Sequence, residues 1–177
     1  MDIEHVDGRT KRRWDLSNLA EVEEAFRQVR RDKPQLLVLS PPCTKFCSLQ
    51  NLRKWGIPRS EWVYAVRMVN VAVRLGELQL DGGRDFVFEH PLGASSWRLP
   101  SLRRLRRRAG VCEATVHMCM HGLKAEDKEG IAPAMKPTRI LTSSVAIRDS
   151  VARVCDRSHR HVQLVSGRAA AAQEYTV

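Results

Sequence analysis

The chain has 177 residues, of which 43% are hydrophobic, and this is enough for one globular domain with a buried core. Its 30 Lys and Arg against 20 Asp and Glu give a net charge of +10, which favours a polyanionic partner such as nucleic acid. No apolar run is long enough to span a bilayer, and the N-terminus lacks a secretory signal pattern. We therefore expect an intracellular protein, nuclear or cytoplasmic, with no membrane partner. The five cysteines are an odd number, unlike the paired framework of a small secreted domain.

The first predicted elements are a helix and a strand. Asn18 followed by Glu21 is typical of a capping box, and the apolar residues after it recur at helical spacing. This helix is expected to end near Lys33 and Pro34, because the residue before a proline disfavours the helical conformation. The run 35–40 is uniformly apolar, which predicts a parallel strand buried on both faces.

A long helix over 61–80, capped by Ser60, is predicted to connect this strand to a second apolar strand, "FVFE", at 86–89. Strand, helix and strand in this order indicate a right-handed crossover unit in an α/β sheet. The remaining predicted elements are a short basic helix, two strands with a polar loop between them, and two last helices. The basic helix covers 101–109. The strands cover 111–120 and 138–144, with the loop 121–137 between them, and the two last helices cover 145–155 and 168–173.

Two strand ends carry unusual residues. The first strand ends in "SPPC", which presents Cys43, and the second ends in "EHP", which presents Glu89. Ligands of open α/β sheets bind outside the carboxyl ends of the strands, and neighbouring strands lie about 4.8 Å apart. We therefore expect Cys43 and Glu89 to face one pocket.

These segments resemble a known family. "LLVLSPPCTKFCSLQNL" is similar to the catalytic loop of DNA cytosine-5 methyltransferases, and "FVFEHP" resembles their following motif. The resemblance implies a Rossmann-like methyltransferase sheet in which Cys43 is the nucleophile and Glu89 holds the target base. Pro41 and Pro42 would then hold the nucleophile rigidly beside the cofactor, S-adenosylmethionine, and His90 stands where the family has an asparagine and would contact the substrate.

The match is weaker at the cofactor site. "RRWDLSN" resembles the segment with which the family contacts the adenine ring, and this assigns that role to Asp15. Asp2 would grip the ribose hydroxyls. The family's glycine-rich loop is absent from the sequence, and its Gln-x-Arg-x-Arg strand is at best replaced by His117, Cys119 and His121. We therefore expect residues 1–177 to form a single partial methyltransferase-like domain, truncated at its N-terminal half, with a complementary chain or domain supplying the missing loop.

Nucleic acid is the expected partner, DNA more than RNA, with phosphates held by the basic helix through Arg103, Arg104 and Arg107. Two alternatives stay open. One is a non-catalytic, basic nucleic-acid-binding module derived from a methyltransferase or a mobile-element polyprotein. The other is an amino-methyltransferase, because "SPPC" also resembles an Asn/Asp/Ser-Pro-Pro-aromatic loop, although Cys43 in place of the aromatic residue argues against it.

A second group of residues has the chemistry of metal ligands. Cys155, His159 and His161 fall within seven residues, and Cys119 with His121 could complete a tetrahedral zinc site. The spacing departs from the usual paired Cys-x-x-Cys form. Our primary interpretation contains no metal, and the sequence leaves zinc as an open question.

Overall fold

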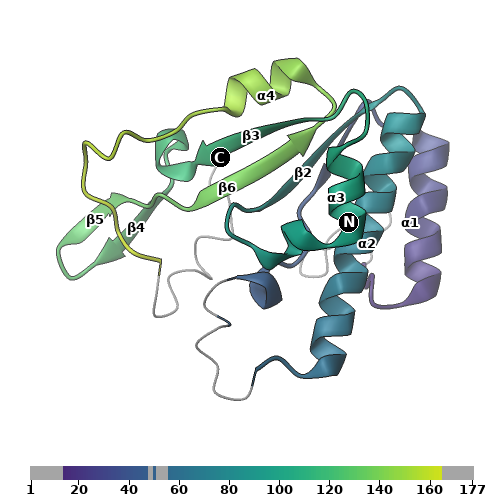
Figure 1. Cartoon of the computed structure of the whole chain (residues 1–177), viewed down its shortest axis with the longest axis horizontal. Helices are drawn as coiled ribbons and strands as arrows, with labels where there is room; N and C mark the ends of the chain where they lie inside the picture. The colour runs from purple at the N-terminus through teal and green to yellow at the C-terminus, as the bar shows by residue number, and fades with distance from the viewer. Residues whose placement is uncertain (1–13, 48–49, 51–55, 165–177) are drawn as a thin grey trace.

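The computed structural model describes residues 14–47, 50 and 56–164, so Asp2 and the predicted helix over 168–173 lie outside the described residues. The described part is a mixed α/β fold with a four-stranded sheet, a two-stranded hairpin and four α-helices (Figure 1). The strands are β1 (Leu36–Leu39), β2 (Asp85–Pro91), β3 (Cys112–His117), β4 (Lys124–Asp127), β5 (Gly130–Pro133) and β6 (Pro137–Thr142). The α-helices are α1 (Leu19–Asp32), α2 (Arg59–Asp81), α3 (Pro100–Arg106) and α4 (Val145–Val151). Short 3-10 turns are η1 (Thr44–Phe46), η3 (Ser95–Arg98) and η4 (Met118–His121).

The strand order of the sheet is β1-β2-β6-β3. β1 and β2 are parallel, and α2 connects them, which confirms the predicted crossover unit. β6 runs antiparallel to both of its neighbours, β2 and β3. β3 is therefore parallel to β1 and β2. The carboxyl ends of these three strands lie at the same end of the sheet; by edge we mean such an end, not an outer strand.

Helix α2 packs on β1 and β2 through two close contacts. Gly76 faces Phe86 and Leu39, and a Cβ at Gly76 would lie 3.3 Å from the Phe86 ring, so only a glycine allows this approach without displacement. The buried Gln79 amide donates to the carbonyl oxygens of Pro34 (2.8 Å) and Asp85 (3.0 Å). The carboxyl end of α2 is thereby fixed to the starts of β1 and β2.

Helix α1 confirms the predicted boundaries. The Asn18 side chain accepts a hydrogen bond from the Ala20 amide, and Lys33 ends the helix in the left-handed conformation (φ 43°) just before Pro34. The prediction for α2 was wrong at its start: Pro58 is the N-cap residue rather than Ser60. A proline suits this position because the first turn of a helix needs no donor there.

Two further predictions were wrong. β1 is not buried on both faces, because Leu36 (43%) and Val38 (63%) lie on the same face of the strand and are exposed. The segment predicted as a polar loop forms the β4–β5 hairpin, whose tight turn uses Gly130 at φ 99°. Figure 1 shows this hairpin projecting beyond the start of β6.

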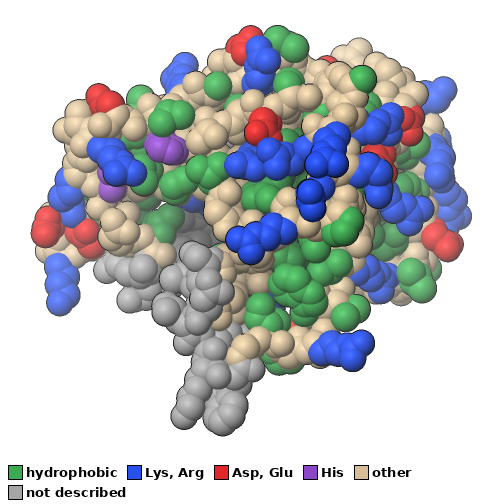
Figure 2. Space-filling view, in the orientation of Figure 1, with side chains coloured by type: hydrophobic (Ala, Val, Ile, Leu, Met, Phe, Trp, Pro, Cys, Tyr) green, Lys and Arg blue, Asp and Glu red, His purple; other side chains and the backbone are tan. Residues whose placement is uncertain are grey.

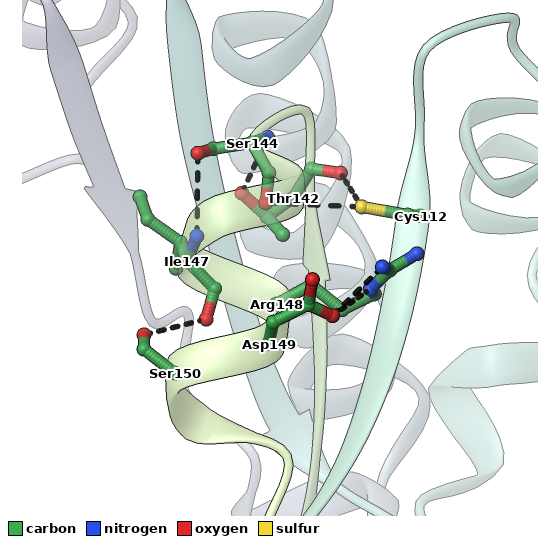
Figure 3. A network of polar contacts seen from close by, with 7 residues as sticks. All are labelled: Cys112, Thr142, Ser144, Ile147, Arg148, Asp149 and Ser150. Carbon is green, nitrogen blue, oxygen red and sulfur yellow. Dashed lines mark hydrogen bonds and ion pairs between the residues drawn. The ribbon is translucent and has the colours of Figure 1, made fainter.

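Helix α4 covers β3 and β6 and begins with a capped turn. The Ser144 hydroxyl accepts from the Ile147 amide (3.3 Å), and the Cys112 thiol donates to the Thr142 carbonyl (3.3 Å), as Figure 3 shows. The helix is shorter than predicted and ends at Val151, after which the chain continues without regular structure to Leu164. Among the described residues, no helix is long and apolar enough to cross a membrane.

Candidate functional site

Cys43 and Glu89 lie at the ends of adjacent parallel strands. Cys43 follows β1 as the first residue before η1, and its carbonyl accepts from the Phe46 amide (2.9 Å), which closes a tight turn. Glu89 lies in β2 directly after Phe88, the residue that pairs with Leu39 at the end of β1. The two side chains are near enough for the charge of Glu89 to act on the thiol. The strand register places both residues at adjacent strand ends, and the expectation that they face one pocket stays a prediction.

The electrostatic environment of Cys43 includes a third group, Lys136. Burial raises the pKa of the Cys43 thiol above its ordinary value, and the negative charge of Glu89 raises the pKa further, whereas the positive charge of Lys136 opposes both effects. Lys136 lies directly before β6, whose first residues pair with the last residues of β2. Cys43 is therefore a protonated thiol at neutral pH, and its ionisation depends on the charges of two neighbouring side chains.

No sequence pattern singled out Lys136. It falls in the segment predicted as a loop, 93 positions after Cys43, and only the antiparallel return of β6 beside β2 brings it to this edge. Its backbone is unusual for a non-glycine residue, with φ 31°, and its carbonyl accepts from the Thr138 hydroxyl (3.2 Å).

Aromatic side chains pack against one another beneath the turn that holds Cys43, on the side of the protein core. Phe46 is 1% exposed, and its ring packs against Trp62 (5.1 Å between centroids) and His90 (5.7 Å). Lys45, in the same turn, forms an ion pair with Glu61 in the first turn of α2. These contacts fix η1 to α2 and to the end of β2.

His90 is completely buried, which places it beneath the site rather than on its surface. Its Nδ1 lies 2.7 Å from the Ser96 hydroxyl, and the ring also packs against Phe88 and Trp97. Burial lowers the pKa of His90 to about 4, although the nearby backbone carbonyls of Pro41 and Pro42 favour its charged form. His90 is therefore neutral at pH 7 and supports the proline turn, whereas the sequence predicted that it contacts substrate.

A cavity of about 410 Å³ lies beside β1 and contains the two prolines that the sequence assigned to cofactor binding. Trp14 and Leu16 line it, but Asp15 between them does not. Hydrogen bonds from the side chain and the backbone amide of Ser17 to the Asp15 carboxylate lower the pKa of Asp15. The complete lining is Trp14, Leu16, Gln28, Val29, Leu37, Val38, Leu39, Ser40, Pro41, Pro42, Tyr64, Met68, Val71, Ala72 and Leu75.

This lining fits only part of S-adenosylmethionine. Its apolar walls suit an aromatic ring, but no described residue in it is charged, and the positively charged sulfonium and ammonium groups of the cofactor need acidic partners. The described residues therefore do not complete a cofactor site.

The arginines of the basic helix lie away from Cys43. Arg104 contacts Glu77 (3.3 Å) and Arg108 contacts Asp81 (2.6 Å), and both acids lie in the last turns of α2. The first turn of α2 packs beside η1, whereas the last turns of α2 lie beside the starts of β1 and β2. Arg104 and Arg108 are therefore at the opposite end of the strands from Cys43. The predicted phosphate contacts therefore concern a surface separate from the thiol.

Arg103 and Arg107 are exposed on the same helix, and neither forms an ion pair with another described residue. They line two shallow hollows beside α3, together with Arg106 and Pro100. Figure 2 shows basic side chains gathered over this part of the molecule. The surface has the charge that a polyanion would need.

Four side chains with metal-ligand chemistry converge elsewhere, at the end of β3: Cys119, Cys155, His159 and His161. His121, which the sequence also offered, points elsewhere, with its Nε2 3.1 Å from the Val151 carbonyl.

Comparisons of the chain with protein-family models, with curated proteins and with solved structures gave no match.

Proposed function

We propose that this chain carries the base-activating site of a DNA cytosine-5 methyltransferase-like protein, with Cys43 as the nucleophile and Glu89 as the residue that holds the base. One observation carries the proposal: the thiol and the carboxylate come from the ends of adjacent parallel strands, and the charge of Glu89 acts on Cys43. The motif resemblance of "SPPC" and "FEHP" supports the same assignment.

The proposed fold is the part of a Rossmann-like methyltransferase sheet that carries this site. The crossover β1-α2-β2 and the common edge of three parallel carboxyl ends are compatible with it. The cofactor would be S-adenosylmethionine, which supplies the methyl group when it is bound. Because the described lining is uncharged, the glycine-rich part of the cofactor site would come from a complementary chain or domain.

The chain's own residues can perform a cofactor-independent reaction on cytosine. Cys43 loses its proton to solvent, and the thiolate adds to C6, so that an S–C6 bond forms and electron density moves to C5. Glu89 favours the addition through hydrogen bonds to N3 and the exocyclic amine. C5 takes a proton from solvent and then releases its original one, which restores the C5–C6 double bond and expels the thiolate. The net result is hydrogen exchange at C5.

We therefore expect exchange at C5 of cytosine when the protein is incubated with single-stranded DNA in D₂O without cofactor. Cys43→Ala should reduce exchange to the level of DNA alone. Glu89→Gln should slow it by roughly 100-fold or more, because a positioned acid group contributes about 10²–10⁴-fold. Mass spectrometry of the recovered cytidine measures the incorporated deuterium.

The matched control is Cys47→Ala, four residues from the proposed nucleophile and also partly buried. It should exchange like the unchanged protein. Equal loss in both cysteine variants would indicate a disturbed loop, and equal exchange in the protein and in Cys43→Ala would refute the nucleophile.

A second candidate is a non-catalytic nucleic-acid-binding module, which the basic surface of α3 favours. Arg103→Ala with Arg107→Ala should then lower the slope of log affinity against log salt for duplex DNA by roughly 2, because each neutralised phosphate contributes about 0.9. Arg27→Ala on α1, where Arg27 pairs with Glu24, is the control and should leave the slope unchanged. Fluorescence anisotropy over a salt series measures the slope.

The two candidates separate cleanly. DNA binding that depends on Arg103 and Arg107, without any C5 exchange, would support the module alone. An unchanged slope in the double arginine variant would remove α3 from the nucleic-acid interface.

A further inference from the structure

Four potential metal ligands from two distant parts of the chain meet beside the end of β3. Cys119 comes from η4, directly after β3, whereas Cys155, His159 and His161 come from the segment after α4. Their ligand atoms all lie within 4.8 Å of one another. The cluster shares no residue with the Cys43 site, and none of its members has a role in the chemistry proposed there.

Two distances within the cluster match those of a tetrahedral metal site. The Cys155 sulfur lies 3.7 Å from Nε2 of His159 and 3.5 Å from Nε2 of His161. A zinc ion holds sulfur at about 2.3 Å and nitrogen at about 2.0–2.1 Å, and with tetrahedral angles these bonds place a sulfur and a nitrogen ligand about 3.6 Å apart. Two imidazoles and two thiols are also the donor set that zinc prefers.

We propose that Cys119, Cys155, His159 and His161 bind one Zn²⁺ ion in a closed, four-coordinate structural site. All four positions are protein ligands, so no position remains for water or substrate, as is typical of structural rather than catalytic zinc.

The surrounding backbone supports Cys155 as a thiolate ligand. The Arg157 amide donates to the Cys155 sulfur (3.2 Å), and Arg157 adopts the left-handed conformation (φ 65°) that turns this amide inward. The Cys155 amide donates to Nδ1 of His117 (3.0 Å), the last residue of β3. Cys155 is 5% exposed, so its position is set by this shell of contacts.

The site would explain how a segment without helix or strand stays in place. Besides the cluster, backbone hydrogen bonds join Arg153 to His117 and Val162 to Pro133 (both 2.9 Å). Arg160 pairs with Asp127 at the hairpin turn (2.8 Å). Zinc would join this segment to η4 across 36 residues of sequence, and binding energy of this kind is folding energy. Figure 2 shows histidine side chains beside the hairpin on this face.

The test begins with the full chain as purified. We expect about one equivalent of zinc per chain by metal analysis. After removal by a chelator, added Co²⁺ should produce the thiolate charge-transfer and visible absorption bands of a tetrahedral site, and Zn²⁺ should abolish them. An apo protein that folds but gives no cobalt bands at millimolar Co²⁺ overturns the proposal.

Ligand variants locate the site. Cys155→Ser and His161→Ala should each weaken Zn²⁺ binding by more than about 100-fold. Loss of a residue that only hydrogen-bonds to a metal ligand already costs roughly 10–100-fold, and loss of the ligand itself should cost more. The matched controls Cys112→Ser and His121→Ala lie outside the cluster and should bind Zn²⁺ as the unchanged chain does. Unchanged affinity in Cys155→Ser, or equal loss in His121→Ala, would place the metal elsewhere and refute these ligands.

Discussion

Glu89→Gln is expected to make Cys43 more reactive toward iodoacetamide at neutral pH, and Lys136→Met is expected to make it less reactive. The negative charge of Glu89 raises the pKa of the Cys43 thiol, so its removal lowers the pKa and increases the thiolate fraction. The positive charge of Lys136 lowers the same pKa, so its removal has the opposite sign. The measurement is the alkylation rate of the Cys43 peptide, followed by mass spectrometry over a pH series.

The control for this experiment is Glu113→Gln. Glu113 lies at the start of β3, where it pairs with Arg106 (2.8 Å), at the opposite edge of the sheet from Cys43. Its removal should leave the midpoint of the Cys43 profile unchanged. Midpoints that coincide in the Glu89 and Lys136 variants would contradict the electrostatic coupling on which the site is built.

The coupling has a consequence for the proposed chemistry. When a base binds, its N3 and Glu89 share a proton taken up from solvent, which neutralises the carboxylate, and the pKa of Cys43 should then fall while the base is bound. The thiol would thus be activated only when a substrate is present. Glu89→Gln therefore separates two effects, since it should increase alkylation and yet slow C5 exchange, because the glutamine cannot supply the proton to N3.

Local sequence signals predicted most of the secondary structure correctly. The cap at Asn18 and the proline at 34 fixed both ends of α1, because caps and prolines act within a few residues. The exposure of β1 could not be predicted, since an apolar run does not reveal whether other elements cover both faces of its strand. The hairpin was missed because each of its strands has only 4 residues and β5 ends in a proline, although Gly130 after three polar residues is a turn signal.

Sequence could likewise predict some residues of the candidate sites and not others. Cys43 and Glu89 could be found from sequence because each lies at the end of an apolar strand, and the order strand, helix, strand predicts that such ends are adjacent. Lys136 could not, because its position depends on where β6 lies in the sheet. The sequence offered both Cys119 and His121 as partners of the segment 155–161, and only the fold shows that Cys119 joins the cluster and His121 does not. Non-local strand order is the information that the sequence pattern lacks.

His90 should make the protein less stable in mild acid. Its pKa is lowered to about 4 in the folded state from an ordinary value of 6.5, so the unfolded chain binds the proton more readily. The stability contributed by neutral His90 is complete above pH 6.5 and is lost as the pH falls from 6.5 towards 4. The loss is at most about 3.5 kcal/mol, because one pKa unit corresponds to about 1.4 kcal/mol.

His90→Asn removes the proton site and should flatten this dependence, at a cost of about 1–3 kcal/mol at pH 7 from lost packing of the ring against Phe46 and Trp97. Urea unfolding at pH 7, 6, 5 and 4.5 measures the free energy of both proteins. An excess of chelator in every sample keeps the cluster of Cys119, Cys155, His159 and His161 free of metal in both proteins. His121→Asn, at an exposed position, should keep the original slope. Parallel curves for the unchanged protein and His90→Asn would show that His90 is not the buried neutral support of the Cys43 turn.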